Sequence, residues 1–487
     1  MRKPWLKLVA LPIAFMFAAS ACGSDDNNNS AATSGTQAAT TTAAASATSG
    51  ATGSTEAGPG TTEAAASTDT GETTTLPPTP GPGTAGSVTV FGVEDSENEA
   101  GAMQDALKKF GDANGIKVTY VGRRDFEQQI NSQVLGGNPP DIAAFPQPGK
   151  LAQFATDGSL LPLPADVTTA ISKNWDPSFL AFSNVDGKQF GTPIKNDLKS
   201  LVWYVPSVWK AKGYEVPKTL TEFKALEDKM IANGDTPLCV GIESGPATGW
   251  PFTDWVEELV LREQGIDYYN KWVKHEVPFN DQPVVDAFNE VAGPDGIWTK
   301  KGAVYSSGGS IASTAFGDNG EPLVQGKCMM HRQANFFAAF FPDGTKFGTG
   351  DGEVSTFYFP SDKGQPVLVG GINAGAFRDA PEVWKVMTYL GSPEFANDRQ
   401  AAQTKRVGGG NSGFLTGNKN ADSTLWNSLE QGFLKTLATA NPAAFDASDQ
   451  MPADVGSGSF WTEGTSFVNG DEDAKTATAN IEASWPS

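Results

Sequence analysis

Aromatic side chains and hydrogen-bonding side chains occur together near the turns of this chain. The aromatic members of this group lie close to Gly, Ser, Asp or Asn residues: Trp203, Tyr204, Trp250, Trp255, Phe336, Phe337, Phe460 and Trp461. A sugar ring presents an apolar C–H face and a rim of hydroxyls, so a carbohydrate site combines flat aromatic rings with carboxylates, amides and arginines. Each tryptophan taken alone is as often a core residue, but the combination favours a carbohydrate-binding site.

Motifs of catalysis are scarce. The sequence contains no G-x-S-x-G elbow, no P-loop and no H-E-x-x-H pair. Gly408, Gly410 and Gly413 satisfy G-x-G-x-x-G, but they follow a predicted helix, whereas a dinucleotide-binding turn follows a strand. We interpret these glycines as a loop.

One pair of carboxylates allows an enzymatic alternative. Asp254 with Glu257 or Glu258 could act as the acid and base of a glycoside hydrolase. These residues lie within about one turn of a predicted helix, where carboxylates more often form a solvated face. The hydrolase therefore remains an alternative to a binding protein.

Composition narrows the ligand classes further. The formal net charge of -21 argues against nucleic acid, because a protein that binds phosphate backbones needs a basic footprint. His275 and His331 are the only histidines, and neither has a metal-ligand spacing to a cysteine. We expect no metal and no cofactor.

The first 22 residues have the pattern of an export signal. Arg2 and neighbouring lysines precede an apolar stretch over 8–17 that is too short to span a bilayer. Small residues then lead directly to Cys22, which resembles the lipidated cysteine of a bacterial lipoprotein, with a signal peptide over 1–21. The alternative is an ordinary secretory signal that is cut near Ala21.

A low-complexity segment follows the cysteine. Residues 22–86 are almost entirely Ala, Thr, Ser, Gly, Asn and Pro. Such a segment cannot bury enough apolar surface to offset the entropy of ordering its backbone, so we expect a disordered linker. Together with a lipidated Cys22, this linker would hold a globular body near a membrane.

Two cysteines remain in the globular body. Cys239 and Cys328 each lie in a short apolar run of an exported protein, which favours a disulfide between them. The alternative is two buried, inert thiols.

The body begins with alternating strands and helices. Apolar periodicity predicts strands over 87–93, 117–121 and 141–145, with helices over 101–114 and 125–135 between them. This alternation predicts a parallel sheet flanked by helices, with ligands bound at the carboxyl ends of the strands.

The rest of the body adds further elements of both kinds. Thr219 and Glu222 form a capping-box sequence that opens a helix over 219–232. Further strands are predicted over 200–204, 237–242, 327–330 and 354–359, and further helices over 254–262, 283–291, 381–390, 393–402 and 473–485.

The order of several segments resembles a known family. These segments are NPPDIAAFPQPGKLAQFATDGSLLPL, GKQFGTPIKNDLKSLVWYVPSVWKAKGYEVPKTLTEF, QGKCMMHRQANFF and GGINAGAF. In this order they resemble the extracellular solute-binding proteins of ABC importers, in the carbohydrate-binding family that includes maltose-binding protein. The segment PLCVGIESGPATGWPFTDWVEELVLR resembles the α-glucoside-binding branch.

The resemblance implies an α/β, two-lobed periplasmic-binding-protein fold of type II-like topology, without catalytic residues. Each lobe would be a mixed sheet flanked by helices, and a sugar would bind in the cleft between the lobes. The chain would cross between the lobes near 192–200 and 369–374. Lobe 1 would comprise 87–194 and 371–405, and lobe 2 would comprise 195–370 and 406–487.

The resemblance also implies ligand-binding residues. Those of the first lobe and the first crossing are Glu94, Asp95, Gln147, Lys195 and Asp197. Those of the second lobe are Tyr204, Trp250, Asp254, Trp255, Arg332, Phe336 and Trp461. Tyr204 matches the tyrosine of a family W-Y-N motif, although Val205 replaces the asparagine, and Trp461 is the strongest stacking candidate.

The leading hypothesis is therefore a monomeric, lipid-anchored receptor on the extracytoplasmic face of the cell membrane. It would pass an α-glucoside or related oligosaccharide to the permease of an ABC transporter. A surface-tethered glycan-processing enzyme and a structural surface protein without a small ligand are the alternatives.

Overall fold

The computed structural model describes residues 77–486. Residues 73–487 form one compact unit. The predicted signal peptide over 1–21, the lipidation at Cys22 and the linker up to residue 76 lie outside the described residues. Within 77–486, no helix combines the length and the apolarity that crossing a bilayer requires.

The first sheet contains six strands in the order β13-β12-β3-β1-β2, with β6 paired to β12. Strand β1 (Ser87–Gly92) pairs in parallel with β2 (Lys117–Gly122) and β3 (Ile142–Phe145), as the sequence predicts. Strand β12 (Val367–Ala376) pairs antiparallel with β3, so the sheet is mixed.

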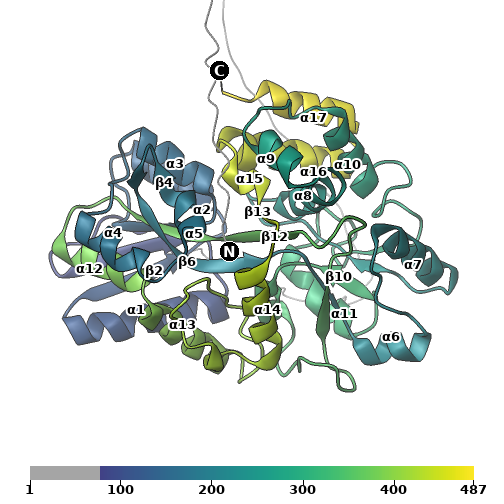
Figure 1. The fold of residues 1–487 in the computed structure, drawn as a ribbon, viewed down its shortest axis with the longest axis horizontal. Helices are drawn as coiled ribbons and strands as arrows, with labels where there is room; N and C mark the ends of the chain where they lie inside the picture. Colours follow the sequence, from purple (N-terminus) through teal and green to yellow (C-terminus); the bar gives the residue numbers. More distant parts are fainter. Residues whose placement is uncertain (1–76, 487) are drawn as a thin grey trace, which may run out of the picture. The chain divides into compact units, whose positions relative to one another are not determined.

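Helices cover both faces of this sheet (Figure 1). They are α1 (Glu97–Asn114), α2 (Phe126–Leu135), α3 (Pro148–Thr156), α4 (Ala165–Ser172), α5 (Pro177–Leu180), α12 (Pro381–Leu390) and α13 (Pro393–Arg406). Helix α1 begins four residues before the predicted start, because the Ser96 side chain accepts a hydrogen bond from the Glu99 amide and caps the helix there.

Two long antiparallel strands connect the two halves of the compact unit. Strand β6 (Gly191–Leu198) pairs with β12 from Gly191 opposite Gly375 to Leu198 opposite Val369. The first three residues of β12 also pair in parallel with the short strand β13 (Ala443–Phe445). Every residue of β6 and β12 is buried, and Figure 1 shows both strands running between the two groups of helices.

The second sheet has the strand order β11-β7-β10-β8-β9. Its strands are β7 (Leu201–Tyr204), β8 (Leu238–Cys239), β9 (Val304–Tyr305), β10 (Met330–Arg332) and β11 (Ser355–Tyr358). The strand predicted over 237–242 has only two residues, because the Ile242 amide bonds to the loop carbonyl of Ile311. A disulfide joins Cys239 to Cys328, with the Cα atoms 5.4 Å apart.

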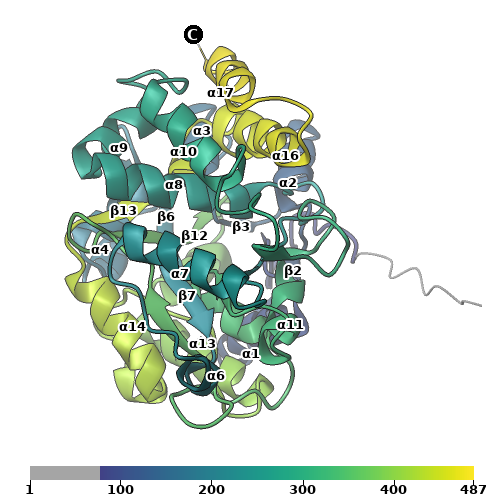
Figure 2. The ribbon, with the colours of Figure 1, turned by 90° about the vertical axis from the view of Figure 1, so that its right-hand side faces the viewer.

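A larger set of helices surrounds the second sheet (Figure 2). These helices are α6 (Pro206–Lys212), α7 (Leu220–Ala232), α8 (Trp250–Gln264), α9 (Ile266–Val273), α10 (Gln282–Ala292), α11 (Gly320–Val324), α14 (Ser428–Thr439), α15 (Ala447–Gln450), α16 (Trp461–Asn469) and α17 (Ala474–Ala483). The Thr219 side chain caps α7 by accepting from the Glu222 amide. The face of α17 that bears Ala477 and Ile481 packs into the core of this half, as its spacing predicts.

The end of the predicted linker lies against the first sheet. The Gly83 amide donates to both carboxylate oxygens of Asp141 at 3.0 Å, and the Gln133 amide group donates to the Pro80 carbonyl at 2.6 Å. A Cβ atom on Gly83 would lie 2.6 Å from Asp141 Oδ2, so this approach requires glycine. The Pro/Gly-rich composition of 77–86 predicts a linker, whereas the structure places these residues against the body.

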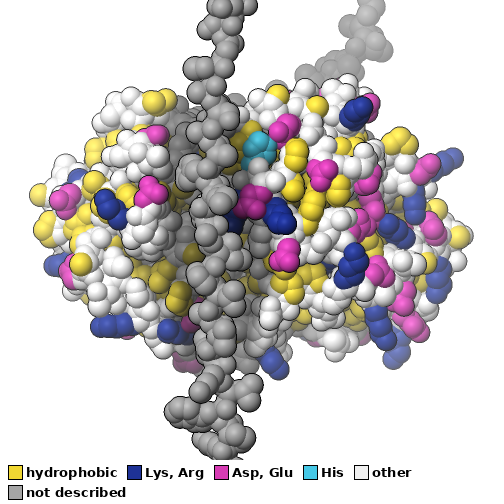
Figure 3. All heavy atoms as spheres, turned by 45° about the horizontal axis from the view of Figure 1, so that its top comes forward, with side chains coloured by type: hydrophobic (Ala, Val, Ile, Leu, Met, Phe, Trp, Pro, Cys, Tyr) yellow, Lys and Arg dark blue, Asp and Glu magenta, His cyan; other side chains and the backbone are white. Residues whose placement is uncertain are grey.

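Acidic and basic side chains are interspersed on the face drawn in Figure 3, outside its grey atoms. On this face, the uncovered lysines and arginines do not form one extended basic field.

Candidate functional site

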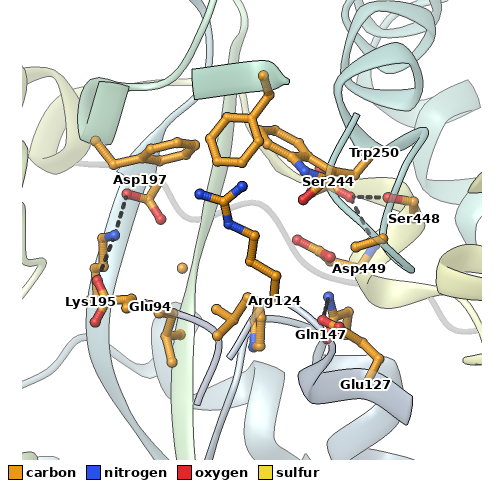
Figure 4. Close-up of a pocket in the computed structure, with 18 of the residues that line it drawn as sticks. Glu94, Arg124, Glu127, Gln147, Lys195, Asp197, Ser244, Trp250, Ser448 and Asp449 are labelled. Carbon is orange, nitrogen blue, oxygen red and sulfur yellow. Dashed lines mark hydrogen bonds and ion pairs between the residues drawn. The ribbon is translucent and has the colours of Figure 1, made fainter. Parts of the chain in front are cut away.

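A cavity of about 150 Å³ lies between residues of the two sheets (Figure 4). One side comes from the loops after β1, β2 and β3, and the strands β6 and β12 contribute Lys195, Asp197, Gly371 and Ile372. The other side comes from the loop between β8 and α8, from the short helical segments after β9 and β10, and from the segment after β13. The lining residues are Val93, Glu94, Asp95, Glu99, Arg124, Glu127, Pro146, Gln147, Lys195, Asp197, Lys199, Ser244, Ala247, Trp250, Phe316, Phe336, Phe340, Gly371, Ile372, Asp446, Ser448, Asp449 and Trp461.

The structure brings together eight of the twelve residues that the sequence proposes for the ligand. Glu94, Asp95, Gln147, Lys195, Asp197, Trp250, Phe336 and Trp461 all line this cavity. The first five follow strand ends or lie on the crossing strand β6. Their convergence agrees with the rule that ligands bind beyond the carboxyl ends of parallel strands.

An ion network around Lys195 supports the first-lobe side of the cavity. Lys195 Nζ lies 2.9 Å from Glu94 Oε1 and 3.3 Å from Glu99 Oε1, and Arg399 donates to both oxygens of Glu94 at 3.1 Å. Burial alone would raise the pKa of Glu94, but the charges of Arg399 and Lys195 lower it to about 2. Glu94 is therefore an anion held between two cations.

Asp197, on the crossing strand β6, offers a free acceptor to the cavity. Its Oδ1 atom makes no hydrogen bond within residues 77–486, and its nearest cation is Lys195 Nζ at 3.7 Å. Burial raises the pKa of Asp197, although Lys195 and Lys199 oppose that rise. Figure 4 shows its carboxylate beside the cavity, so this oxygen is available to a ligand.

A second network surrounds Lys199, which directly follows β6. Its Nζ atom lies 3.0 Å from Asp254 Oδ1, contacts Asp446 and lies 3.8 Å from Asp449 Oδ2. Burial raises the pKa of Asp254 to about 6 despite Lys199 and Arg332. Here three aspartates surround one lysine, and Arg332 pairs with Asp254 as a second cation.

Four of the proposed ligand residues do not line the cavity. Asp254 is fully buried because Lys199 and Arg332 bind its two oxygens. Arg332 uses its guanidinium on Asp254 and on Glu258, at 3.0 and 3.2 Å. Asp254 and Arg332 therefore support the wall of the cavity without lining it.

The other two are packing residues. Tyr204, at the end of β7, packs against Trp209 and Phe357, with ring centroids 4.7 and 5.3 Å apart. Trp255 lies on the face of α8 that points into the core, where it packs against Trp298 and Phe359. Neither ring reaches the cavity lining.

Aromatic rings and cations form the second-lobe wall. Trp250 lies 5.1 Å from Phe316 and 6.0 Å from Phe336 between ring centroids. Lys195 Nζ lies 5.2 Å from the Phe336 ring, and Lys199 Nζ lies 5.8 Å from the Trp250 ring. Lys195 and Lys199 therefore contact aromatic rings of the cavity as well as its carboxylates.

Trp461 contributes both a ring and a donor. It is 3 % exposed and lines the cavity at the start of α16. Its indole Nε1 has no hydrogen-bond partner among the described residues. A buried N–H group without an acceptor is costly, so this group favours a ligand that accepts a hydrogen bond.

Acidic and amide groups from the two lobes meet at one end of the cavity. Gln147 Nε2 donates to Glu127 Oε1 at 3.1 Å, which leaves Gln147 Oε1 and Glu127 Oε2 without hydrogen-bond partners in the described part of the chain. Ser448 and Asp449 face them from the second lobe (Figure 4). Burial raises the pKa of Glu127 and, together with Asp446, that of Asp449.

Several lining residues were not identified from the sequence. Glu127, Lys199, Asp446 and Asp449 are the charged examples whose groups shape the cavity most directly. A signal for Asp446 was present, because it follows the short apolar strand β13 just as Glu94 follows β1. No group of three or more His, Cys, Asp or Glu residues within 77–486 is arranged to hold a metal ion.

Known proteins are similar to this chain in sequence and in fold. The family model of the bacterial extracellular solute-binding proteins matches residues 96–397. The alpha-glucosides-binding periplasmic protein AglE of Rhizobium meliloti is 36% identical over 82% of this chain and 87% of its own length. The osmoprotective compounds-binding protein GgtB of Synechocystis is 37% identical over 83% of this chain and 95% of its own length.

Solved structures agree on the fold. The bacterial solute receptor AcbH has a TM-score of 0.67 at 21% identity, over 82% of this chain and 97% of its own. Maltose-bound MalE3 of T. maritima has a TM-score of 0.62 at 17% identity, over 82% and 98%. These neighbours confirm the predicted two-lobed α/β fold, and with the sequence relatives they are binding proteins rather than enzymes. This chain belongs to the bacterial extracellular solute-binding proteins.

Proposed function

We propose that this protein captures an α-glucoside or a related oligosaccharide between its two lobes and delivers it to the permease of an ABC transporter. A lipid on Cys22 would hold it at the extracytoplasmic face of the membrane. The single observation that carries the proposal is a set of unpaired polar atoms on the cavity wall, next to aromatic rings.

These polar atoms match the chemistry of a hydroxyl-rich ligand. Among the described residues, Glu127 Oε2, Gln147 Oε1 and Asp197 Oδ1 are acceptors without hydrogen bonds, and Trp461 Nε1 is a donor without one. Leaving such a group buried and unpaired costs about 1–3 kcal/mol. A hydroxyl both donates and accepts, so neighbouring hydroxyls of a sugar can satisfy acceptors and donor together.

The rings complete the match. Trp250, Phe316, Phe336 and Trp461 give the cavity flat apolar surfaces beside its carboxylates. The C–H faces of sugar rings pack on such surfaces, while an anionic ligand would meet an excess of carboxylates. Both features favour a neutral, hydroxylated solute.

The relatives support the same class of solute. The name of AglE refers to alpha-glucosides, and the name of GgtB refers to osmoprotective compounds. A small glucoside satisfies both descriptions if the osmoprotective compound is hydroxylated. The description of the family as extracellular supports a location outside the cytoplasm.

A binding screen tests the proposal. The fragment 73–487 would be titrated with maltose, trehalose, sucrose, galactose, glucose 6-phosphate and glycine betaine, followed by calorimetry and thermal unfolding. We expect saturable binding of an α-glucoside, unchanged sugar after incubation, and about 2.7 kcal/mol of stabilisation at 100 times the Kd. Binding of glycine betaine or the phosphate ester alone, or no response to any sugar, would contradict the proposal.

The anchor needs a separate experiment in cells. Cys22→Ser should release the protein from the membrane fraction into the medium or periplasm while leaving the affinity of the body for sugar unchanged. Retention of the Cys22→Ser protein in washed membranes would exclude this cysteine as the anchor.

A further inference from the structure

We propose that Gly149 is a positioning residue for closure of the two lobes, because its missing side chain lets the first turn of α3 seat on the backbone of the opposite lobe. This inference deepens the proposed function and rests on it. It assigns closure to a contact that lies outside the cavity lining.

The contact is unusually close. A Cβ atom added to Gly149 would lie 2.0 Å from the Met451 carbonyl oxygen and 2.9 Å from that of Gln450. Side-chain carbons essentially never approach another atom within 3.0 Å, and both partners are backbone atoms that cannot rotate away. Gly149 lies within α3 and has no left-handed φ, so glycine serves here to save space rather than to allow an unusual backbone conformation.

The two sides of the contact belong to different hydrophobic cores. Leu151 and Phe154 of α3 pack with Phe91 and Phe145 on the first sheet. Met451 packs in the core of the second half, together with the helices around α8. Because each side of the contact is fixed in its own hydrophobic core, the distance across the contact changes with the distance between the lobes.

The contact also adjoins the cavity. Gln147 lies two residues before Gly149, and Asp449 lies two residues before Met451. Gln147 and Asp449 both line the cavity, and they lie near each other across it in Figure 4. A Cβ at position 149 would have to move the two backbones apart by about 1 Å, which would separate the acceptors of the two lobes.

Separation of the lobes should weaken binding without removing any ligand contact. Closure is a population shift, so a ligand that touches both lobes binds tightly only to the state in which they meet. A variant that disfavours that state lowers the apparent affinity by the fraction of closed protein that is lost.

The test uses the fragment 73–487, which contains every contact described above. Gly149→Ala is compared with Gly432→Ala in α14, where an added Cβ would meet no atom within 4 Å. Binding of the best α-glucoside from the screen is measured by calorimetry. We expect the Kd to rise at least tenfold in Gly149→Ala, to rise further in Gly149→Val, and to stay within twofold of wild type in Gly432→Ala.

A second readout does not depend on any ligand. Dyes on Ala113→Cys and Ala232→Cys, two exposed positions at the ends of α1 and α7, report the distance between the lobes by single-molecule energy transfer. The two native cysteines of the fragment are in the disulfide and do not react. We expect a short-distance population in wild type that is depleted in Gly149→Ala at an unchanged melting temperature.

The outcomes separate the two proposals. If wild type binds no solute of the screen, the proposed function fails, and the distance histograms of the ligand-free proteins decide the inference. Identical histograms for wild type and Gly149→Ala, or equal affinities where a ligand binds, would overturn the role of Gly149. A variant that melts early would be compared with wild type at a lower temperature where both are folded, and equal histograms there would overturn the role of Gly149 too.

Discussion

Two lysines four residues apart organise the two sides of the cavity in different ways. Lys195 and Arg399 enclose Glu94, so this carboxylate contacts two cations and has the lower pKa of the two compared here. Asp254 also contacts two cations, Lys199 and Arg332, but Lys199 is shared with Asp446 and Asp449, and burial outweighs the cations at Asp254. The pKa of Glu94 accordingly falls to about 2, and that of Asp254 rises to about 6.

The two lysine networks therefore have different roles in the site. Glu94 stays ionised at neutral pH, so we interpret its ion pairs with Lys195 and Arg399 as the frame of the first-lobe side. Asp254 titrates closer to neutrality, so the stability contributed by the second-lobe network should respond to pH in that range.

Removal of a cation from the first-lobe network should have the largest effect. Arg399→Met leaves Glu94 buried beside Lys195 alone, and breaking a buried ion pair in this way costs about 3–5 kcal/mol. The free energy of unfolding in urea measures the loss. Arg406→Met on the same helix is the control, because its partner Asp105 is half exposed, and it should cost less than about 1 kcal/mol. Equal losses in the two variants would contradict the frame assigned to the first lobe.

The two networks should also give opposite dependences of stability on pH. The folded pKa of Glu94 lies below its ordinary value of 4.5, so its stabilisation, about 3 kcal/mol, is complete above pH 4.5 and is lost as the pH falls toward 2. The folded pKa of Asp254 lies above its ordinary value of 3.8, so its contribution is lost as the pH rises from about 4 to about 6.

Asp254→Asn isolates the second of these effects. Relative to wild type, the variant should become progressively more favourable between pH 4 and pH 6 and keep the acid limb below pH 4.5. Urea unfolding at a series of pH values gives the difference curve. A flat difference curve would show that Asp254 does not titrate in this range.

Trp461 tests the second-lobe wall through ligand binding, because it adds a ring and a hydrogen-bond donor to that wall. Trp461→Ala should raise the Kd for the α-glucoside roughly tenfold or more without unfolding the body. Trp461→Phe keeps an aromatic face but removes the N–H group, so it should fall between wild type and Trp461→Ala. Unaltered affinity in the alanine variant would remove Trp461 from the site.

The smallest effect is expected outside the lining. Tyr204→Phe changes a residue that packs against Trp209 and Phe357 and does not reach the cavity. Calorimetry should give a Kd within twofold of wild type. A larger change would mean that the second-lobe wall extends further than its lining residues indicate.

The sequence predicted the first-lobe half of the site better than the second-lobe half. Glu94, Asp95 and Gln147 follow parallel strands, whose carboxyl ends must meet at one edge of a sheet. On α8, by contrast, Trp250 lines the cavity, Asp254 binds Lys199 behind it and Trp255 points into the core. Helical periodicity marks this segment as buried, but it does not indicate which face meets the cavity.

Contacts between segments that are distant in the chain could not be predicted from the sequence either. Asp449 comes from a four-residue helix more than 300 residues after Gln147, and only the tertiary structure brings the two side chains to one cavity. The positions of β1, β2 and β3 and of helices such as α1, α7 and α12 follow local periodicity and were predicted within a few residues. The helices α3, α14 and α16 were not predicted. The close approach at Gly149 has no local signature at all, because φ there is ordinary for a helix.

A crystal structure of residues 73–487 with the tightest-binding α-glucoside tests the central claim most directly. The account predicts a sugar between the lobes, with hydroxyls within hydrogen-bond distance of Asp197 Oδ1, Gln147 Oε1 and Trp461 Nε1. A sugar bound outside the cavity, or inside it with these three atoms still unpaired, would contradict the account.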